Sequence, residues 1–453
     1  MNPSCNASTV DSFSSPSGTV KSTVLNLGNV PRRSQLLKQI EAANRWGVML
    51  AVVQFLAVVL LAILIDWNQA VTEPWVTTVA IGAVVGPFAM ELLRFWVVKK
   101  KRIEDLKEQT RFGEFDKYRL AKLYKATLDR LRLPNDRLPV YIVADKSMNA
   151  AMMHVGMGRI FRALNGIYLN RQVLHKLTAD EIQDIMGHEL GHYYRHYLLS
   201  DRYRLLTLVL GSMLGMFVAQ LLGMEGFFSM IALLVCSQGF WWLAAWQRAR
   251  HSMAIEFLCD DFGAQVSGIA TSVAGLMKLG AEMEVLTAIQ QQAILSASSG
   301  KLDAHEVVEA IFTAIPYGHA TPEEIQKAVA KQIEKRSEQG ATVGGFLRYM
   351  WQSDVDAEAG AELEKAMRKL KALESVPRLP WESLLRNPKE IQFDEQSISA
   401  LVAMIESHPE AELFHTPEAL GESDGQHPPL KLRVLYLWHN RHEIEAVAAG
   451  AAA

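Results

Sequence analysis

The sequence predicts a mainly α-helical membrane protein with four transmembrane helices and a cytosolic α+β domain that contains a small sheet. Three observations lead to this fold class. Four apolar blocks are each long enough, at about 20 residues, to cross a bilayer as a helix. A capped helix with two histidines one turn apart lies between the second and third blocks. A short stretch rich in β-branched residues precedes that helix and predicts strands.

The composition and net charge argue against nucleic acid as a binding partner. The 453 residues are 49% hydrophobic and 21% charged, with a net charge of −3. This near balance gives no basic surface of the kind that binds nucleic acid, so we expect no nucleic-acid partner. Three cysteines, Cys5, Cys236 and Cys259, are too few and too scattered for a disulfide framework or a C-x-x-C metal site.

The apolar blocks have the length and the flanking residues of membrane spans. Tryptophans at or near the ends of the first, second and fourth blocks are typical of an aromatic belt. Their length and their lack of interior charge favour spans over buried globular helices. Glu91 and Arg94, one turn apart near the end of the second block, are the exceptions and could pair or snorkel. The four blocks are Trp46–Trp67, Trp75–Val98, Tyr203–Leu222 and Phe227–Trp246.

Lysine and arginine predict the orientation. Every positive cluster lies on one side of the predicted spans, and the strongest is Lys99–Arg102 after the second span. The opposite connections, Asp66–Pro74 and Gly223–Gly226, contain no lysine or arginine. The positive-inside rule therefore places both termini and the soluble domain in the cytoplasm. We expect a multi-pass protein of a bacterial inner (plasma) membrane.

These features divide the chain into six parts. Within the soluble domain we predict helices at 103–132 and 251–285, a strand at Pro139–Ala144, and one or two strands within 151–169. The parts are a disordered arm (1–35), a transmembrane hairpin (36–98), the first part of the soluble domain (99–202), a second hairpin (203–246), the second part of the soluble domain (247–445) and a flexible tail (446–453).

A helix is predicted to begin at Thr178. The Thr178 hydroxyl can accept from the backbone N–H of Glu181, and the Glu181 carboxylate can accept from the N–H of Thr178, which together form a capping box. Leu177 and Ile182 stand where a hydrophobic staple would fix the direction of the chain. The segment His188-Glu-Leu-Gly-His192 therefore falls in the middle turns of a helix.

This helix places two histidines on one face. His188 and His192 are one turn apart, which is the geometry that lets two imidazoles hold one Zn²⁺. Glu189 lies beside the metal, where it can take a proton from water. The alternative is a surface helix that carries two histidines by chance. The cap, the helix and the spacing agree with a single zinc per chain.

A later helix supplies candidates for the third ligand, which a catalytic zinc usually requires. Glu256 and Asp260 are four residues apart and share a helical face. We expect Glu256 to bind the metal and Asp260 to accept from the outer N–H of a ligand histidine. His196 and Cys259 are weaker candidates, because each projects away from the predicted site.

These motifs resemble the HtpX-like and CAAX-prenyl-protease family of membrane-bound zinc metalloendopeptidases. The resemblance covers roughly Asn149–Ala264 and a later patch, Gln426–Arg433, similar to the family's H-P-x-x-x-x-R element. Four spans are closer to the HtpX-like branch than to the seven-span prenyl proteases. The resemblance implies a gluzincin-type metalloprotease domain that acts on a protein or peptide. It does not extend over residues 270–425.

The resemblance also implies further site residues. Asn149 and Ala150 would lie on an edge strand that aligns the substrate backbone. Separately from the resemblance, the tetrahedral oxyanion needs a donor, and we expect His427 to supply it, although His427 could instead cap a helix; His408 is a weaker candidate for the same role. Met253 stands where the family usually has an arginine, for which Arg250 could substitute from one turn away.

Three functions follow as expectations. The first is an endopeptidase for misfolded or unassembled membrane proteins, with the bilayer as its surroundings. The second is a processing peptidase with one dedicated lipidated or prenylated substrate. The third is an inactive membrane scaffold, against which the complete set of His188, Glu189, His192 and Glu256 argues.

Overall fold

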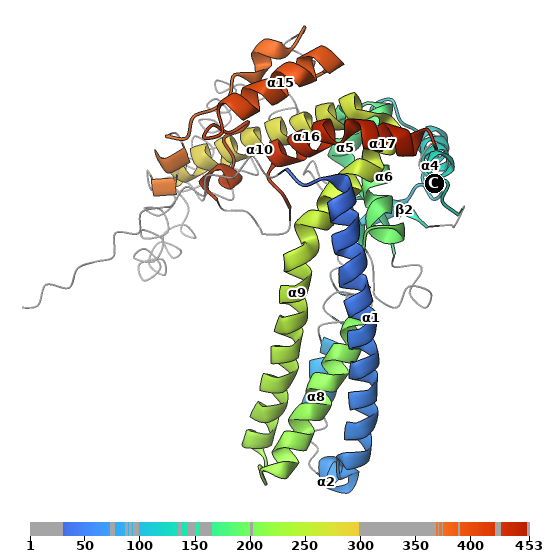
Figure 1. Cartoon of the computed structure of the whole chain (residues 1–453), viewed down its shortest axis with the longest axis vertical. Coiled ribbons are helices and arrows are strands. Elements are labelled where there is room, and N and C mark those ends of the chain that lie inside the picture. The colour runs from blue at the N-terminus through green and yellow to red at the C-terminus, as the bar shows by residue number, and fades with distance from the viewer. Residues whose placement is uncertain are drawn as a thin grey trace, which may run out of the picture.

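The computed structural model is a helical stalk below a mixed α/β head (Figure 1). The stalk contains α1 (Arg33–Leu64), α8 (Arg204–Leu221) and the first half of α9 (Phe227–Ser267). The structure describes residues 30–72, 78–86, 89, 93, 99–134, 138–143, 150–153, 165–199, 203–298, 368–369, 371–373, 375–387, 390–421 and 427–450.

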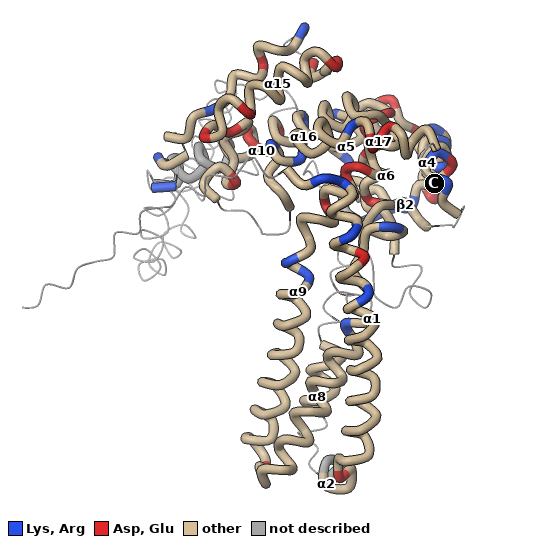
Figure 2. Tube along the Cα trace, viewed as in Figure 1, with Lys and Arg blue, Asp and Glu red and all other residues tan. Residues whose placement is uncertain are grey.

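Three of the described helices, α1, α8 and α9, are long and apolar enough to cross a membrane. They coincide with the first, third and fourth predicted spans. Figure 2 shows that the middle of the stalk carries no lysine, arginine, aspartate or glutamate in its described helices. Many of its large apolar side chains are exposed, which is rare on a water-soluble surface and typical of a lipid-facing one.

The second predicted span falls mostly outside the described residues. Of Trp75–Val98, only 78–86, 89 and 93 are described, and these are helical. Glu91 and Arg94 lie outside them, and four spans remain a prediction. Residues 1–29 of the predicted arm also lie outside the described part, and α1 begins at Arg33, well before the predicted start of the first span.

The α8–α9 hairpin packs closely through glycines. A Cβ at Gly215 would lie 2.5 Å from Leu233 Cα, and one at Gly211 would lie 2.9 Å from Ser237 Cα, so only glycine permits this approach. The polar pair Gln54 and Thr207 joins α1 to α8 through a 3.1 Å hydrogen bond inside the stalk.

Helix α9 belongs to both parts of the molecule. Its 41 residues extend about 60 Å at 1.5 Å per residue, twice the apolar thickness of a bilayer. The fourth predicted span and the helix predicted after it are therefore one continuous helix. The helix predicted at 251–285 is instead interrupted at Gly268, where φ is +88°, and α10 (Ile269–Ser298) follows.

The head contains a four-stranded sheet of order β1-β2-β4-β3. Strands β2 (Val140–Val143) and β4 (Gly166–Asn170) are parallel, and the edge strands β1 (Lys100–Arg102) and β3 (Ala150–Met153) are antiparallel to them. We predicted no strand at Lys100–Arg102. Its charged residues tolerate an edge position because only one side of the strand is paired.

Two cores of the head meet on α9, and α6 (Ala179–Tyr194) contributes to one of them. In the first, one face of the sheet packs on α6, with α4 (Lys117–Arg130) and α5 (Arg171–Lys176) beside it. The second joins the upper half of α9 to helices that follow it in the chain. These are α10, η2 (Trp381–Leu384), α15 (Glu395–Ser407), α16 (Leu430–His439) and α17 (Arg441–Ala448), with the short α2 (Trp67–Thr72) and η3 (Pro417–Leu420) outside both cores.

Both ends of the described chain are attached to the head. Arg33 Nε donates to Asp261 Oδ2 at 2.6 Å, and Arg33 N donates to Asn440 Oδ1 at 2.8 Å. The start of α1 is thus bonded to α9 and to the junction of α16 and α17. Helix α17 continues through Ala448, two residues beyond the predicted start of the flexible tail at Ala446.

Candidate active site

Helix α6 begins where the sequence predicts. Thr178 N donates to Glu181 Oε2 at 2.8 Å, and Glu181 N donates to Thr178 Oγ1 at 3.4 Å, which confirms the capping box. Lys278 of α10 adds a second bond, Nζ to Glu181 Oε2 at 2.8 Å. These contacts determine the start of the helix that carries His188, Glu189 and His192.

Glycines bring α6 and α9 close together. A Cβ at Gly191 would lie 3.1 Å from Cys259 Sγ, and one at Gly187 would lie 3.0 Å from Gly263 Cα. A Cβ at Gly263 would in turn lie 2.8 Å from the carbonyl oxygen of Asp184. The two helices can therefore cross near backbone contact, and a short carboxylate on α9 can reach the histidines of α6.

Three side chains converge at this crossing. His188 Nε2 and His192 Nε2 are 3.2 Å apart, and the Glu256 carboxylate oxygens lie 3.5 Å from the first and 3.3 Å from the second. Each residue can offer one ligand atom to a common metal. We call His188, His192 and Glu256 the donor cluster.

The spacing within the donor cluster fits zinc. Tetrahedral bonds of about 2.0–2.1 Å place ligand atoms about 3.3 Å apart, close to the three separations observed. Two histidines and one glutamate are also a known donor set of catalytic zinc sites. The residues present therefore fit the metal that the sequence predicts.

Asp260 lies behind the donor cluster. Its Oδ1 is 2.9 Å from His188 Nδ1, and its Oδ2 accepts from Arg433 Nε at 2.7 Å. Burial raises the pKa of Asp260, but the charge and hydrogen bonds of Arg433 and His188 outweigh it and hold that pKa well below its usual range. Asp260 thus stays ionised and accepts from Nδ1–H, which leaves Nε2 free to face the donor cluster.

The electrostatics of the donor cluster favour a cation. Burial lowers the pKa of His188, but hydrogen bonds to Asp260 and Glu256 raise it to about 10. Burial and the neighbouring His188 lower the pKa of His192 to about 4. Burial raises the pKa of Glu256, but the hydrogen bond with His188 and nearby positive charges lower it to about 2. Arg433 compensates the charge of Asp260, so the ionised Glu256 is the carboxylate that draws positive charge to the donor cluster. The raised pKa of His188 shows the same preference, and a bound metal ion would supply that positive charge in place of the proton.

The other predicted residues lie around the donor cluster. Glu189 is buried, at 6% exposure, next to His188 in the chain and is not one of the three converging residues. His427 Nε2 lies 3.8 Å from Glu256 Oε1 and is half-exposed, at 51% of its side chain. Pro429, rather than His427, occupies the N-cap position of α16. Ala150 begins the edge strand β3, which lies beside α6, and Asn149 lies outside the described residues.

The weaker candidates are not part of the donor cluster. His196 is buried with its ring edge against Phe262, and burial lowers its pKa to about 3. Cys259 is buried against Gly191, and burial raises the pKa of its thiol. His408 lies at the end of α15, where its Nδ1 is 3.3 Å from the carbonyl oxygen of Met404.

One arginine was missed as a site residue. Arg433 appeared in the sequence only as the last residue of a short pattern, yet it is the arginine that reaches Asp260. Arg250, expected to substitute for an arginine at Met253, lies instead over the ring of Trp246 at 5.9 Å. The sequence feature that could have identified Arg433 is its position within the apolar residues of α16. A buried arginine is rarely unpaired, so this position predicts an acidic partner.

Comparison with known proteins agrees with this geometry. The sequence model of the family described as peptidase family M48 matches residues 116–412, which include the donor cluster and Asp260. His427 and Arg433 lie beyond the matched residues. No curated protein and no solved structure matches the chain. The match spans more than half of the chain and implies a metallopeptidase. The protein is therefore a member of peptidase family M48.

Proposed function

We propose that the protein is a membrane-embedded, zinc-dependent endopeptidase that hydrolyses peptide bonds at the cytosolic face of a bacterial inner membrane. The observation that carries this proposal is the donor cluster, whose ligand atoms lie 3.2–3.5 Å apart with an ionised Asp260 behind His188. Zinc bound there would polarise the scissile carbonyl and acidify a water molecule.

The protein's own groups perform the remaining steps. Glu189 accepts a proton from the attacking water and returns it to the leaving amine. Asp260 orients His188, and Arg433 orients Asp260. His427, at the edge of the donor cluster, donates to the oxygen on which charge develops. The edge strand β3, which begins at Ala150, pairs with the substrate backbone, and Asn149, the preceding residue in the chain, takes part in this alignment.

The proposed substrates are misfolded or unassembled membrane proteins. Glu256 is ten residues beyond Trp246 on α9, which places it about 15 Å along the helix axis from the end of the predicted span. An unfolded segment of a substrate that leaves the bilayer can reach Glu256 at this distance from the end of the span. The proposed orientation, with four spans and both termini in the cytoplasm, is supported by the lysines and arginines near the head and by the uncharged stalk (Figure 2).

Metal analysis combined with proteolysis tests the proposal. The purified full-length protein should contain one zinc per chain and cleave an unfolded substrate such as casein. Chelation should abolish cleavage, and added zinc should restore it. Glu189→Gln should keep its zinc and lose about 10²- to 10⁴-fold in rate, because it removes a general base and no ligand. Wild-type rates in Glu189→Gln would contradict the role of this glutamate. No cleavage by the zinc-loaded wild type would favour an inactive scaffold.

A further inference from the structure

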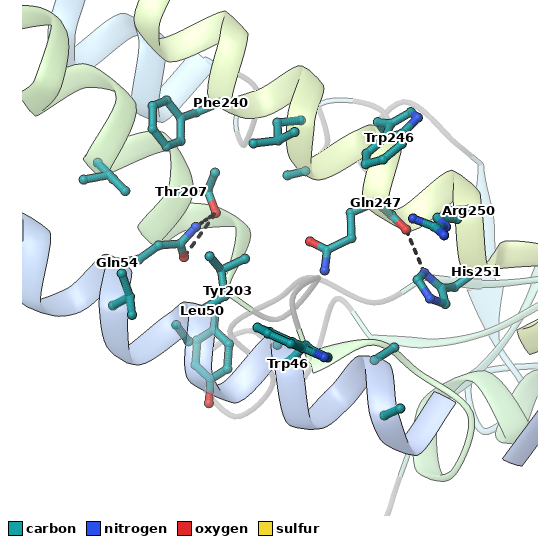
Figure 3. Close-up of a pocket in the computed structure, with 18 of the residues that line it drawn as sticks. Trp46, Leu50, Gln54, Tyr203, Thr207, Phe240, Trp246, Gln247, Arg250 and His251 are labelled. Atoms are coloured by element: carbon teal, nitrogen blue, oxygen red, sulfur yellow. Dashed lines mark hydrogen bonds between the residues drawn. The ribbon is translucent and has the colours of Figure 1, made fainter. Parts of the chain in front are cut away.

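A cavity of about 770 Å³ opens between the helices of the stalk (Figure 3). Residues of α1, α8 and α9 line it, and most of its wall is apolar. His251, at its upper end, precedes Glu256 by five residues on α9, or about 7.5 Å along the axis. The cavity is therefore separate from the donor cluster and lies at the level where the stalk meets the head.

The cavity is polar at one end and apolar along its depth. Gln247, Arg250 and His251 lie at the head end, and the Gln247 side chain points into the cavity (Figure 3). Deeper in the stalk, Gln54 and Thr207 satisfy each other by hydrogen bonding. The remaining wall is mostly apolar and includes Leu50, Val53, Leu210, Phe240 and Leu243.

Arg250 carries the charge at the polar end. Its guanidinium lies over the ring of Trp246 at 5.9 Å, and within the described part of the chain no carboxylate pairs with it. His251 Nδ1 donates to the carbonyl oxygen of Gln247 at 3.1 Å, which holds its ring at the same end. An occupant of the cavity therefore meets a cation at the head end and hydrocarbon below it.

The size of the cavity decides between two kinds of occupant. A transmembrane helix about 10 Å across and 30 Å long occupies about 2,400 Å³, three times the volume available. Hydrocarbon chains are narrower, and half of a bilayer's apolar thickness, about 15 Å, is comparable to the length of one chain. The cavity is therefore too small for a substrate's transmembrane helix and is comparable in size to the hydrocarbon chains of a lipid, whose headgroup would lie outside it.

We propose that this cavity binds one anionic phospholipid, with its phosphate at Arg250 and its acyl chains between α1 and α9. The inference rests on the proposed membrane placement of the stalk. Arginine suits this role because its planar fork of N–H donors matches phosphate oxygens. Trp46 and Trp246, which also line the cavity, are residues that favour the headgroup level of a bilayer.

Lipid retention measured by native mass spectrometry tests the proposal. The delipidated full-length protein in detergent would be titrated with phosphatidylglycerol and, separately, with zwitterionic phosphatidylcholine. We expect one tightly retained phosphatidylglycerol per chain, bound about tenfold more tightly than phosphatidylcholine. Arg250→Gln should remove this preference. Ala244→Trp should fill the cavity and prevent retention, and Ala51→Leu is a smaller filling change if that variant does not fold.

Arg248→Gln is the matched control. It removes the same charge from the same helix two residues away, and Arg248 does not line the cavity. The control should bind phosphatidylglycerol as the wild type does. Equal losses in Arg248→Gln and Arg250→Gln, or equal binding of the two lipids, would overturn the proposal. A retained peptide mass in place of lipid would also overturn it. Because zinc content and cleavage are measured separately, failure here is distinguishable from failure of the proposed function.

Discussion

Arg433 Nε donates to Asp260 Oδ2 at 2.7 Å, while the other oxygen of the same carboxylate lies 2.9 Å from His188 Nδ1. Residues 173 apart in the chain are thus joined directly behind the donor cluster. The side chains of both partners are almost fully buried, so the guanidinium and the carboxylate depend on each other for charge compensation.

Removal of Arg433 should weaken metal binding. In Arg433→Gln, Asp260 loses its strongest partner and no longer holds His188 firmly, so zinc affinity should fall about 10- to 100-fold. Competition with a chromogenic chelator would measure it. Arg386→Gln is the control, because Arg386 pairs with Asp394 at the surface and should leave zinc affinity unchanged. Wild-type affinity in Arg433→Gln would show that the contact does not position the ligand.

Zinc content identifies the ligands. His188→Ala, His192→Ala and Glu256→Ala each remove one donor atom and should empty the site. Cys259→Ala, a change in a buried neighbour of Glu256, should keep one zinc per chain. Elemental analysis of the purified variants would measure the stoichiometry. Full zinc in Glu256→Ala would show that the third ligand lies elsewhere.

Asp184 should make stability depend on pH. Burial raises its pKa to about 6, against the hydrogen bonds from Ser272 and Ser267 that lower it. Since this pKa lies above the unfolded value of 3.8, the stability contributed by the protonated carboxyl is complete below pH 3.8. It is lost as the pH rises through about 6.

Asp184→Asn tests this dependence, because the amide oxygen can accept from both serines and does not ionise. From pH 5 to pH 7.5 the wild type should lose about 1.4 kcal/mol of unfolding free energy relative to Asp184→Asn. Thermal unfolding in detergent over a pH series would measure the difference. Parallel pH profiles for the two proteins would contradict the raised pKa.

The membrane orientation is tested with reporters. A fusion at the C-terminus should behave as cytoplasmic, and an insertion at Gln69 should behave as exported. Gln69 lies in α2, at the end of the stalk farthest from the head (Figure 1). The opposite pattern of activities would place the donor cluster on the outer side and exclude cytosolic substrates.

The sequence by itself determined the features that depend on near neighbours. The capping box of Thr178 and Glu181, the shared face of His188 and His192, and the i,i+4 spacing of Glu256 and Asp260 all follow from helix geometry. The apolar blocks on α1, α8 and α9 were equally readable, because a bilayer requires a minimum length of apolar helix.

Only the tertiary structure decided how these pieces meet. His188 and Asp260 are 72 residues apart, and their contact depends on the crossing of α6 and α9 that Gly187, Gly191 and Gly263 allow. Arg433 reaches the same point from α16. The charged strand Lys100–Arg102 exists because β2 offers it a partner. Such contacts join residues that are far apart in the chain, and no local sequence pattern predicts which distant residues will pack together. Helix caps and helical faces, in contrast, depend only on residues within a few consecutive turns.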